Sequence, residues 1–499
     1  MSTEHKTRPG VWRTKSVEQS IKDTEEPEHQ LKKNLGAFDL TVFGIGVCIG
    51  AGIFILTGQV AATNSGPAIA ISFLLAGTAC ALAALCYAEL ASTVPVAGSA
   101  YTFSYAALGE LVAWTIGWDL ILEFTIGAAA LSVGFSGYLV ALLDGTFLAI
   151  PASLQAAEKD GLVNLPALLI ALVVTAVLIL GIKLSSVFNQ VIVVVKLAVI
   201  AIVVGVGITY IKGGNYTPFV PPSEPAPSSG GWEKAPLIET LLGLEPAVYG
   251  FGGVVAGAAV VFFAFIGFDV VATTAEETKN PQRDLPIGII ASLAIVTVLY
   301  MAVSLVITGM QNYQNINPNS ESPLADAFDA VGVGWMANTI SVGACIGLIA
   351  VAMILMLGQS RVAFAMSRDG LLPGWLAKVH PKYGTPYRIT AIVGVAVAAL
   401  AGVLPLGTLT DLVNIGTLFA FVLVSVGVVL LRRAQPDLPR AFRVPAAPLV
   451  ATLAVLSCTY LMLNLPGETW LRFGIWMVLG FVVYGLYGRT HSRLARDQR

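Results

Sequence analysis

The chain has 499 residues, of which 56% are hydrophobic and 12% charged, with a net charge of −2 and a mean hydropathy of +0.79. This composition excludes an ordinary soluble domain and indicates an integral membrane protein. A net charge so close to zero also gives no reason to expect nucleic acid as a partner.

Residues 1–35 are polar and hold no short apolar core followed by a cleavage site, so we expect a cytoplasmic tail and no signal peptide. Residues 36–488 are predicted to form a single transmembrane domain, and residues 489–499 a second cytoplasmic tail. The five cysteines all lie in apolar stretches, which favours buried thiols over a disulfide framework.

Crossing a bilayer takes about 20 apolar residues, and we predict twelve such segments. They lie at about residues 38–62, 67–92, 108–141, 163–182, 187–211, 252–275, 286–310, 335–366, 386–404, 409–431, 444–464 and 470–488. Lys and Arg number 23 in one set of alternate connections and 4 in the other. This bias predicts a multi-pass protein of the plasma membrane with both termini in the cytoplasm.

The first segment, FDLTVFGIGVCIGAGIFILTG, has closely spaced glycines, and its midpoint falls at Gly50. A dinucleotide fingerprint starting at Gly44 would need a glycine at position 49, where the chain has Ile49, and no strand precedes it. Close packing of helices through small residues would also explain the glycines.

The sixth segment, GGVVAGAAVVFFAFIGFDVVATTAEE, carries FAFIGFD just past its midpoint. Two interrupted helices five segments apart indicate an inverted repeat, with segments 1–5 and 6–10 as its halves and a substrate site at the membrane midplane. Free backbone groups are tolerated at that depth only where they line a cavity and bind something there.

We predict that the backbone at the first break binds a carboxylate, because amides at the start of a half-helix suit an anion. The residues are Cys48, Ile49, Gly50, Ala51 and Gly52. Carbonyl groups at the second break suit an ammonium group, and the residues are Phe263, Ala264 and Ile266. An amino acid carries both groups on one carbon, so the predicted substrate is an amino acid.

Three stretches resemble one family: GIGVCIGAGIFILTG, FFAFIGFDVVATTAEETKNPQRDLP and GQSRVAFAMSRDGLLP (358–373). They are similar to the cationic amino acid transporter subgroup of the amino acid, polyamine and organocation superfamily, and the chain looks like a bacterial member. The resemblance implies an all-α LeuT-type fold, with a 5+5 inverted repeat and two additional helices. It also implies alternating access and transport of L-amino acids.

The fifth segment carries Lys196, about 4–5 Å to the cytoplasmic side of its midpoint at 1.5 Å per residue. A lysine at a helix centre costs about 2.5–3.5 kcal/mol on insertion scales, which makes chance a poor explanation. One explanation is a static buried ion pair, with Glu123 as the natural partner and Asp269 as a second candidate.

A functional explanation is that the lysine replaces an ion. In sodium-coupled members of the fold a sodium ion occupies the region between segments 1, 5 and 8, so the resemblance implies that Lys196 replaces it and that no sodium is needed. Burial disfavours the charged form of a lysine, which would link proton binding to opening of the cytoplasmic path. Our hypothesis is proton-coupled symport, with Lys196 and Glu123 as the coupling pair and Asp269 beside them.

Other acids in the segments favour structural explanations. Asp39 would begin or cap the first helix, and Glu89 and Glu110 would be solvated near cytoplasmic ends. Asp119 shares a helix face with Glu123, and no physical account of it follows from the sequence. The cluster of Glu276, Glu277, Lys279, Arg283 and Asp284 would either stabilise one gated state or form a solvated loop.

Substrate choice depends on the side-chain end of the site, where Met353 near the centre of the eighth segment would favour small neutral amino acids such as alanine. The eighth segment has no acid, although cationic substrates remain open. Obligate amino acid exchange and a non-transporting sensor of the same fold are the alternatives. A small accessory membrane subunit is also left open.

An enzyme is not expected, because the four histidines lie in the tails or a cytoplasmic loop and no H-E-x-x-H motif or paired cysteine ligands occur. We therefore expect no cofactor and no metal, and protons as the coupling ion.

Overall fold

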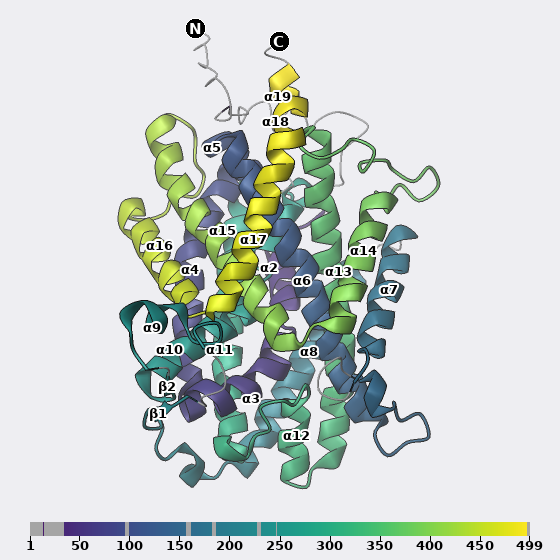
Figure 1. Cartoon of the computed structure of the whole chain (residues 1–499), viewed down its shortest axis with the longest axis vertical. Coiled ribbons are helices and arrows are strands. Elements are labelled where there is room, and N and C mark those ends of the chain that lie inside the picture. Colours follow the sequence, from purple (N-terminus) through teal and green to yellow (C-terminus); the bar gives the residue numbers. More distant parts are fainter. Residues whose placement is uncertain are drawn as a thin grey trace.

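A computed structural model describes residue 13 and residues 34–94, 99–155, 161–181, 186–226, 231–245 and 247–496. This part of the chain is a bundle of helices with one small antiparallel sheet, formed by β1 (Glu224–Pro225) and β2 (Ala247–Val248) (Figure 1). Most of the predicted N-terminal tail and residues 497–499 of the C-terminal tail lie outside the described residues.

Eight of the described helices are long and apolar enough to cross a membrane by length and composition, and four shorter apolar helices accompany them. All twelve predicted segments fall on helical residues, with ends that differ by a few residues. A membrane protein of mainly helical structure is therefore confirmed.

The first half of the chain consists of α-helices and short 3-10 or π-helical segments, which are labelled η. Its elements are α2 (Ala37–Cys48), η2 (Gly52–Leu56), α3 (Thr57–Val60), η3 (Ala61–Ser65), η4 (Gly66–Ala68), α4 (Ile69–Thr93), α5 (Ser99–Ala107), α6 (Glu110–Leu143), η5 (Ala152–Leu154), α7 (Leu165–Ile179), α8 (Ser186–Gly207) and η6 (Ile208–Tyr210).

The connection to the second half holds the small sheet, η7 (Gly213–Tyr216) and α9 (Leu237–Leu242). The remaining elements are α10 (Gly250–Val261), η8 (Phe262–Phe265), η9 (Asp269–Glu277), α11 (Pro281–Met310), η10 (Tyr313–Asn315), α12 (Pro323–Ala330), α13 (Gly334–Arg368), α14 (Tyr387–Val403), α15 (Leu406–Ala434), α16 (Ala447–Leu463), α17 (Gly467–Val483), η11 (Tyr484–Gly488), α18 (Arg489–His491) and α19 (Arg493–Arg496).

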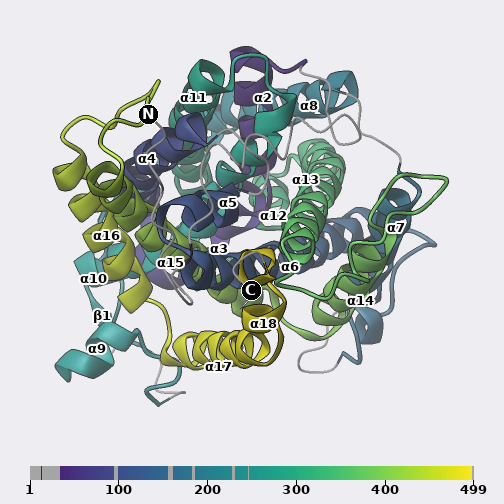
Figure 2. The same cartoon turned by 90° about the horizontal axis from the view of Figure 1, so that it is seen from above.

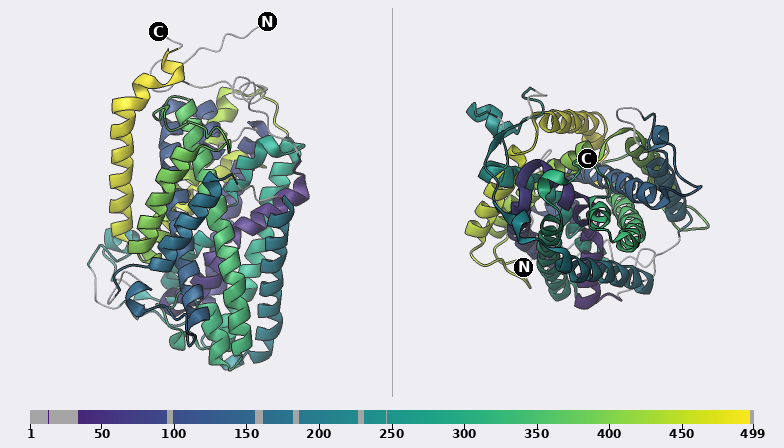
Figure 3. Two further views of the ribbon diagram at one scale, coloured as in Figure 1. Left: turned by 90° about the vertical axis from the view of Figure 1, so that its right-hand side faces the viewer. Right: turned by 90° about the horizontal axis from the view of Figure 1, so that it is seen from below.

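The long helix α6 packs against α13 and α15 in the interior. Seen from above, α7, α14, α16 and α17 lie at the edge of the bundle (Figure 2), and a side view has α17 running along one side (Figure 3). Edge helices expose apolar side chains, such as Ile475 and Val478 of α17, as expected of surfaces that face lipid.

Arg13 and the C-terminal residues Tyr484 and Ser492 meet at the end of the bundle where α6 begins. Arg13 lies 3.9 Å from the Glu110 carboxylate, which also accepts hydrogen bonds from the hydroxyls of Tyr484 (2.8 Å) and Ser492 (2.5 Å). We call this end the termini end. The prediction that Glu110 is solvated is wrong, because its side chain is fully buried by these partners.

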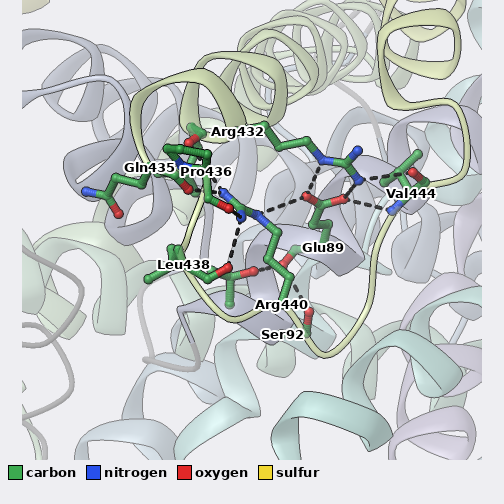
Figure 4. Close-up of polar contacts among 10 residues, drawn as sticks. Glu89, Ser92, Arg432, Gln435, Pro436, Leu438, Arg440 and Val444 are labelled. Atoms are coloured by element: carbon green, nitrogen blue, oxygen red, sulfur yellow. Dashed lines mark hydrogen bonds and ion pairs between the residues drawn. The ribbon is translucent and has the colours of Figure 1, made fainter.

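Glu89 on α4 is also buried instead of solvated, and it ties α4 to the loop after α15 (Figure 4). Its two carboxylate oxygens accept from Arg432, with Oε1 2.8 Å from the guanidinium Nε. The Val444 amide donates to Oε2 at 2.8 Å, and Arg440 lies 3.5 Å from Oε1. The structural interpretation of Glu89 is right, but ion pairs replace the expected solvent.

Candidate functional site

The first predicted segment is interrupted where its glycines predict. Helix α2 ends at Cys48, Ile49 adopts an extended conformation (ψ 90°), and helical structure resumes at Ala51 and continues through η2. The first N–H groups of a helix have no intrahelical acceptor. The residues predicted to receive a carboxylate therefore lie at the start of a new half-helix.

The sixth segment is interrupted as well. Helix α10 ends at Val261, and the chain tightens into η8 before it becomes extended at Ile266 (ψ 133°). Gly267 has φ 117°, a conformation that L side chains rarely adopt. The Asp269 carboxylate accepts from the Gly267 amide at 3.2 Å, so Asp269 holds the bend at the start of η9.

The two breaks touch each other. A Cβ atom on Gly52 would overlap Ala264, and one on Gly267 would overlap the Val47 side chain. The Cys48 thiol lies 3.7 Å from the Phe265 carbonyl oxygen. The predicted carboxylate and ammonium sites are therefore neighbours in space, although more than 200 residues separate them.

Tyr300 on α11 bridges the breaks, a role that was not predicted from the sequence. Its hydroxyl lies 2.6 Å from the Cys48 carbonyl oxygen and 2.6 Å from the Ala264 carbonyl oxygen. One hydroxyl proton serves one carbonyl at a time or is shared between them. The polar hydroxyl in an otherwise apolar run was the only sequence signal available for this residue.

Asn414 on α15, also missed, supports the second break. Its Nδ2 donates to the carbonyl oxygens of Ala259 (2.9 Å) and Val260 (3.1 Å), at the end of α10. An interrupted helix leaves carbonyl groups without their usual partners, and this amide supplies donors for two of them. A buried polar residue in the tenth segment was the signal that could have identified it.

Lys196 binds the end of α2 and forms no ion pair among the described residues. Its ammonium donates to the carbonyl oxygens of Gly46 (2.7 Å) and Ile49 (2.9 Å), and its side chain is 1% exposed. The predicted ion pair with Glu123, or with Asp269, is wrong. The lysine instead satisfies two backbone carbonyls that the break leaves free, at the negative end of a half-helix.

Glu123 and Asp119 lie buried on α6, and their carboxylate oxygens accept no hydrogen bond from the residues that the structure describes. Glu123 lies within electrostatic range of Asp269 at the second break and of Asp119. Glu123 therefore adjoins the site without contributing a direct contact to Lys196.

Met353 lies away from the breaks. It falls on the stripe of α13 that carries the exposed residues Val342, Ile346 and Leu357. Val351 is on the opposite face, where its side chain and that of Leu131 lie against Gly50. The prediction for Met353 is therefore wrong, and Val351 is the residue of α13 that faces the first break.

Asp39 caps α2 as expected: its carboxylate accepts from the Gly36 amide at 2.9 Å. In the predicted charge cluster, Glu277 pairs with Arg361 of α13 at 3.0 Å, and Asp284 is buried. Lys279 and Arg283 are exposed, and the Glu276 side chain lies outside the described residues. The cluster is thus partly a contact between η9 and α13, and its gating role stays a prediction.

A family model described as "Amino acid permease" matches residues 35–484. The chain is 48% identical over 467 residues to the "Methylthioribose transporter" of Bacillus subtilis (strain 168), covering 93% of this chain and 95% of that protein.

Two further relatives bear transporter names. "Branched-chain amino acid permease BcaP" of the same organism is 47% identical over 489 residues, covering 97% of this chain and 99% of that protein. "Cationic amino acid transporter 4, vacuolar" of Arabidopsis thaliana is 41% identical over 411 residues, covering 82% and 65% respectively.

Proposed function

The chain belongs to the amino acid permease family, a family of transporters and not of enzymes, and on that premise we propose that it carries L-amino acids by alternating access. The proposed architecture is twelve transmembrane helices, with a LeuT-type 5+5 inverted repeat followed by two helices. The proposed location is the plasma membrane, with both termini in the cytoplasm.

The pair of touching breaks carries this proposal. One break presents the N-terminal end of a half-helix and the other presents carbonyl oxygens, and Gly52 and Ala264 bring them into contact. An amino acid has a carboxylate for the first and an ammonium group for the second. The Tyr300 hydroxyl is hydrogen-bonded to the Ala264 carbonyl, so the substrate's ammonium group would displace it.

We propose a small neutral amino acid such as alanine as the substrate. Leu131 and Val351, which lie against Gly50, are apolar and cannot pair with a charged side chain. The names of the relatives make branched-chain amino acids and methylthioribose the first competitors to test.

We propose protons as the coupling ion and no requirement for sodium. Lys196 already places a cationic group on the carbonyls of Gly46 and Ile49, which is where a metal cation would otherwise bind oxygen ligands. Loss of the lysine proton would leave an amine with two N–H groups but without the positive charge, which would weaken its bonds to these carbonyls and the contact between α8 and α2.

Uptake of radiolabelled alanine into liposomes that contain the purified protein tests the function. Sodium is absent throughout, an inward proton gradient is present or absent, and valine, leucine, arginine and methylthioribose are competitors. We expect uptake that requires the gradient and that arginine does not inhibit. Uptake that requires internal amino acid and ignores the gradient would show an exchanger, and binding without flux would show a sensor.

A further inference from the structure

Two buried acids on α6 lack a charged partner among the described residues. Asp119 is 0% and Glu123 1% exposed, and in the described part of the chain no group donates a hydrogen bond to their four carboxylate oxygens. The hydroxyl of Thr417 on α15 is the polar group next to Glu123. That hydroxyl has one proton and donates it to the Val413 carbonyl at 3.0 Å, so it reaches the Glu123 carboxylate only if the hydroxyl turns away from that carbonyl.

No cation reaches the pair from the described elements packed on α6. On α13, Arg361 pairs with Glu277; on α17, Arg472 pairs with Glu468; and on α14, Arg388 lies over the rings of Trp375 and Tyr387. Arg368 lies at the termini end of α13, and α7 has no charged residue among those described. Further titratable groups on these elements include Tyr101 and Tyr105 on α5, which bind Asp369 and Glu110, Cys345 on α13, and Tyr484 after α17. Asp411 lies near one end of α15 and Arg432 and Arg433 at the other, and Asp269 on η9 lies within electrostatic range of Glu123.

Helix α15 leaves room for the Asp119 carboxylate. A Cβ atom on Gly416 would lie 2.8 Å from Asp119 Oδ1, so only a glycine at this position allows the present contact without a shift. Asn414, on the same helix, also has an unpartnered Oδ1, although its Nδ2 binds the end of α10. The described side-chain donors of α15 near these acids, the Asn414 amide and the Thr417 hydroxyl, are therefore directed to backbone carbonyls and not to the two carboxylates.

Such an arrangement is costly if both acids are ionised. An unpaired charge inside a membrane domain is expensive, and two carboxylates one helical turn apart repel each other. A bound proton removes a charge and creates an O–H donor for a neighbouring oxygen. Protonation of one acid therefore removes one of the two buried charges and supplies a hydrogen-bond donor where the described residues direct none.

We propose that Asp119 and Glu123 form a proton-binding site between α6 and α15, separate from Lys196. The proton resides on one carboxyl group and is donated as a hydrogen bond toward a neighbouring acceptor, and no other chemical step is involved. Because Glu123 lies within electrostatic range of Asp269, proton binding at the site changes the electrostatic interaction with Asp269 at the second break. The role of this site in coupling protons to transport rests on the proposed function.

Infrared spectroscopy of the purified protein tests proton binding without any transport. A protonated carboxyl group has a C=O stretching band that a carboxylate lacks. We expect this band near neutral pH in the wild-type protein, and we expect Asp119→Asn and Glu123→Gln each to alter it. Asp144→Asn, which changes an exposed acid at the other end of α6, is the matched control.

A second variant protects the test against poor folding of Asp119→Asn. Gly416→Ala keeps both acids but pushes the end of the Asp119 side chain aside, so it should shift the frequency of the band. A band that neither Asp119→Asn, Glu123→Gln nor Gly416→Ala changes would overturn the site.

Uptake in liposomes then tests coupling. We expect Asp119→Asn to reduce gradient-driven alanine uptake at least about tenfold while it preserves exchange of alanine across the membrane. Gradient-driven uptake at the wild-type level would overturn the coupling role even if the band is lost. Absence of uptake in the wild-type protein would count against the proposed function, while the infrared result would still decide the site.

Discussion

Glu89 and Glu123 are two buried glutamates in the same bundle, and they have opposite surroundings. Glu89 is 2% exposed and accepts bonds from Arg432 and Val444, with Arg440 nearby (Figure 4). Glu123 is 1% exposed and accepts none within the described part of the chain. Burial alone therefore does not decide whether an acid is charged, because the available partners do.

Position along the bundle explains the difference. Glu89 is near the termini end, where the last turn of α15 supplies Arg432 and the following loop supplies Arg440, and Arg432 still reaches solvent with 29% of its side chain exposed. Glu123 lies well inside α6, where its described polar neighbours are two acids and the Thr417 hydroxyl and none of them is a cation. The first acid can hold a permanent charge, while the second is suited to gain and lose a proton.

The largest effect should come from Glu89→Gln. Removing one partner of a buried ion pair costs about 3–5 kcal/mol, and the partial exposure of Arg432 places our expectation at the lower limit. Glu123→Gln, the matched change, should cost less than about 1 kcal/mol because no bond is lost. Thermal unfolding in detergent measures both, and equal losses would contradict the comparison.

Lys196→Met adds a buried cation to the comparison. It leaves the carbonyls of Gly46 and Ile49 without a donor, and we expect a loss of about 2–3 kcal/mol in stability because each orphaned group costs about 1–3 kcal/mol. We also expect pH-driven uptake to be abolished. Uptake that retained its full pH dependence in this variant would eliminate Lys196 as a coupling group, and Lys212→Met, an exposed lysine, is the control.

Tyr300→Phe removes an uncharged hydrogen-bonding group, in contrast to the charged side chains of Glu89 and Lys196. The change removes one hydroxyl from between the carbonyls of Cys48 and Ala264, so we expect a loss of about 1–2 kcal/mol in stability. Alanine affinity should change at the same time, because the Ala264 carbonyl is where the ammonium group is proposed to bind. Scintillation proximity binding of alanine measures this, and unchanged affinity would place the ammonium group elsewhere.

Glu321, in the loop before α12, should show an effect on stability that depends on pH. Burial raises the pKa of Glu321 to about 8, so the folded protein holds this proton more tightly than the unfolded chain. Its contribution to stability is complete below its ordinary pKa of 4.5 and is lost as pH rises to about 8.

Glu321→Gln should therefore gain melting temperature over the wild-type protein as the pH is raised from about 5 to about 9. Asp144→Asn, which alters an exposed acid, should show no such trend. A difference between Glu321→Gln and wild type that is the same at every pH would contradict the prediction.

The sequence was sufficient for the helices and for the two breaks. Apolar runs specify membrane helices because a bilayer leaves few alternatives for the backbone. The glycines of GIGVCIGAG and FIGFD mark the breaks because their effect on the backbone is local. These properties depend on residues close together in the chain, so they can be recognised without any tertiary information.

The partners of the buried side chains were decided only by the tertiary structure. Lys196 was expected to meet Glu123 and instead binds carbonyls of α2, and neither Tyr300 nor Asn414 could be assigned to a break. Met353 and Val351 show the physical reason. Successive helical residues are about 100° apart, so residues two positions apart, such as Val351 and Met353, lie on nearly opposite faces of the helix. Only the packing of α13 against α6 and α2 decides which of these faces meets the site.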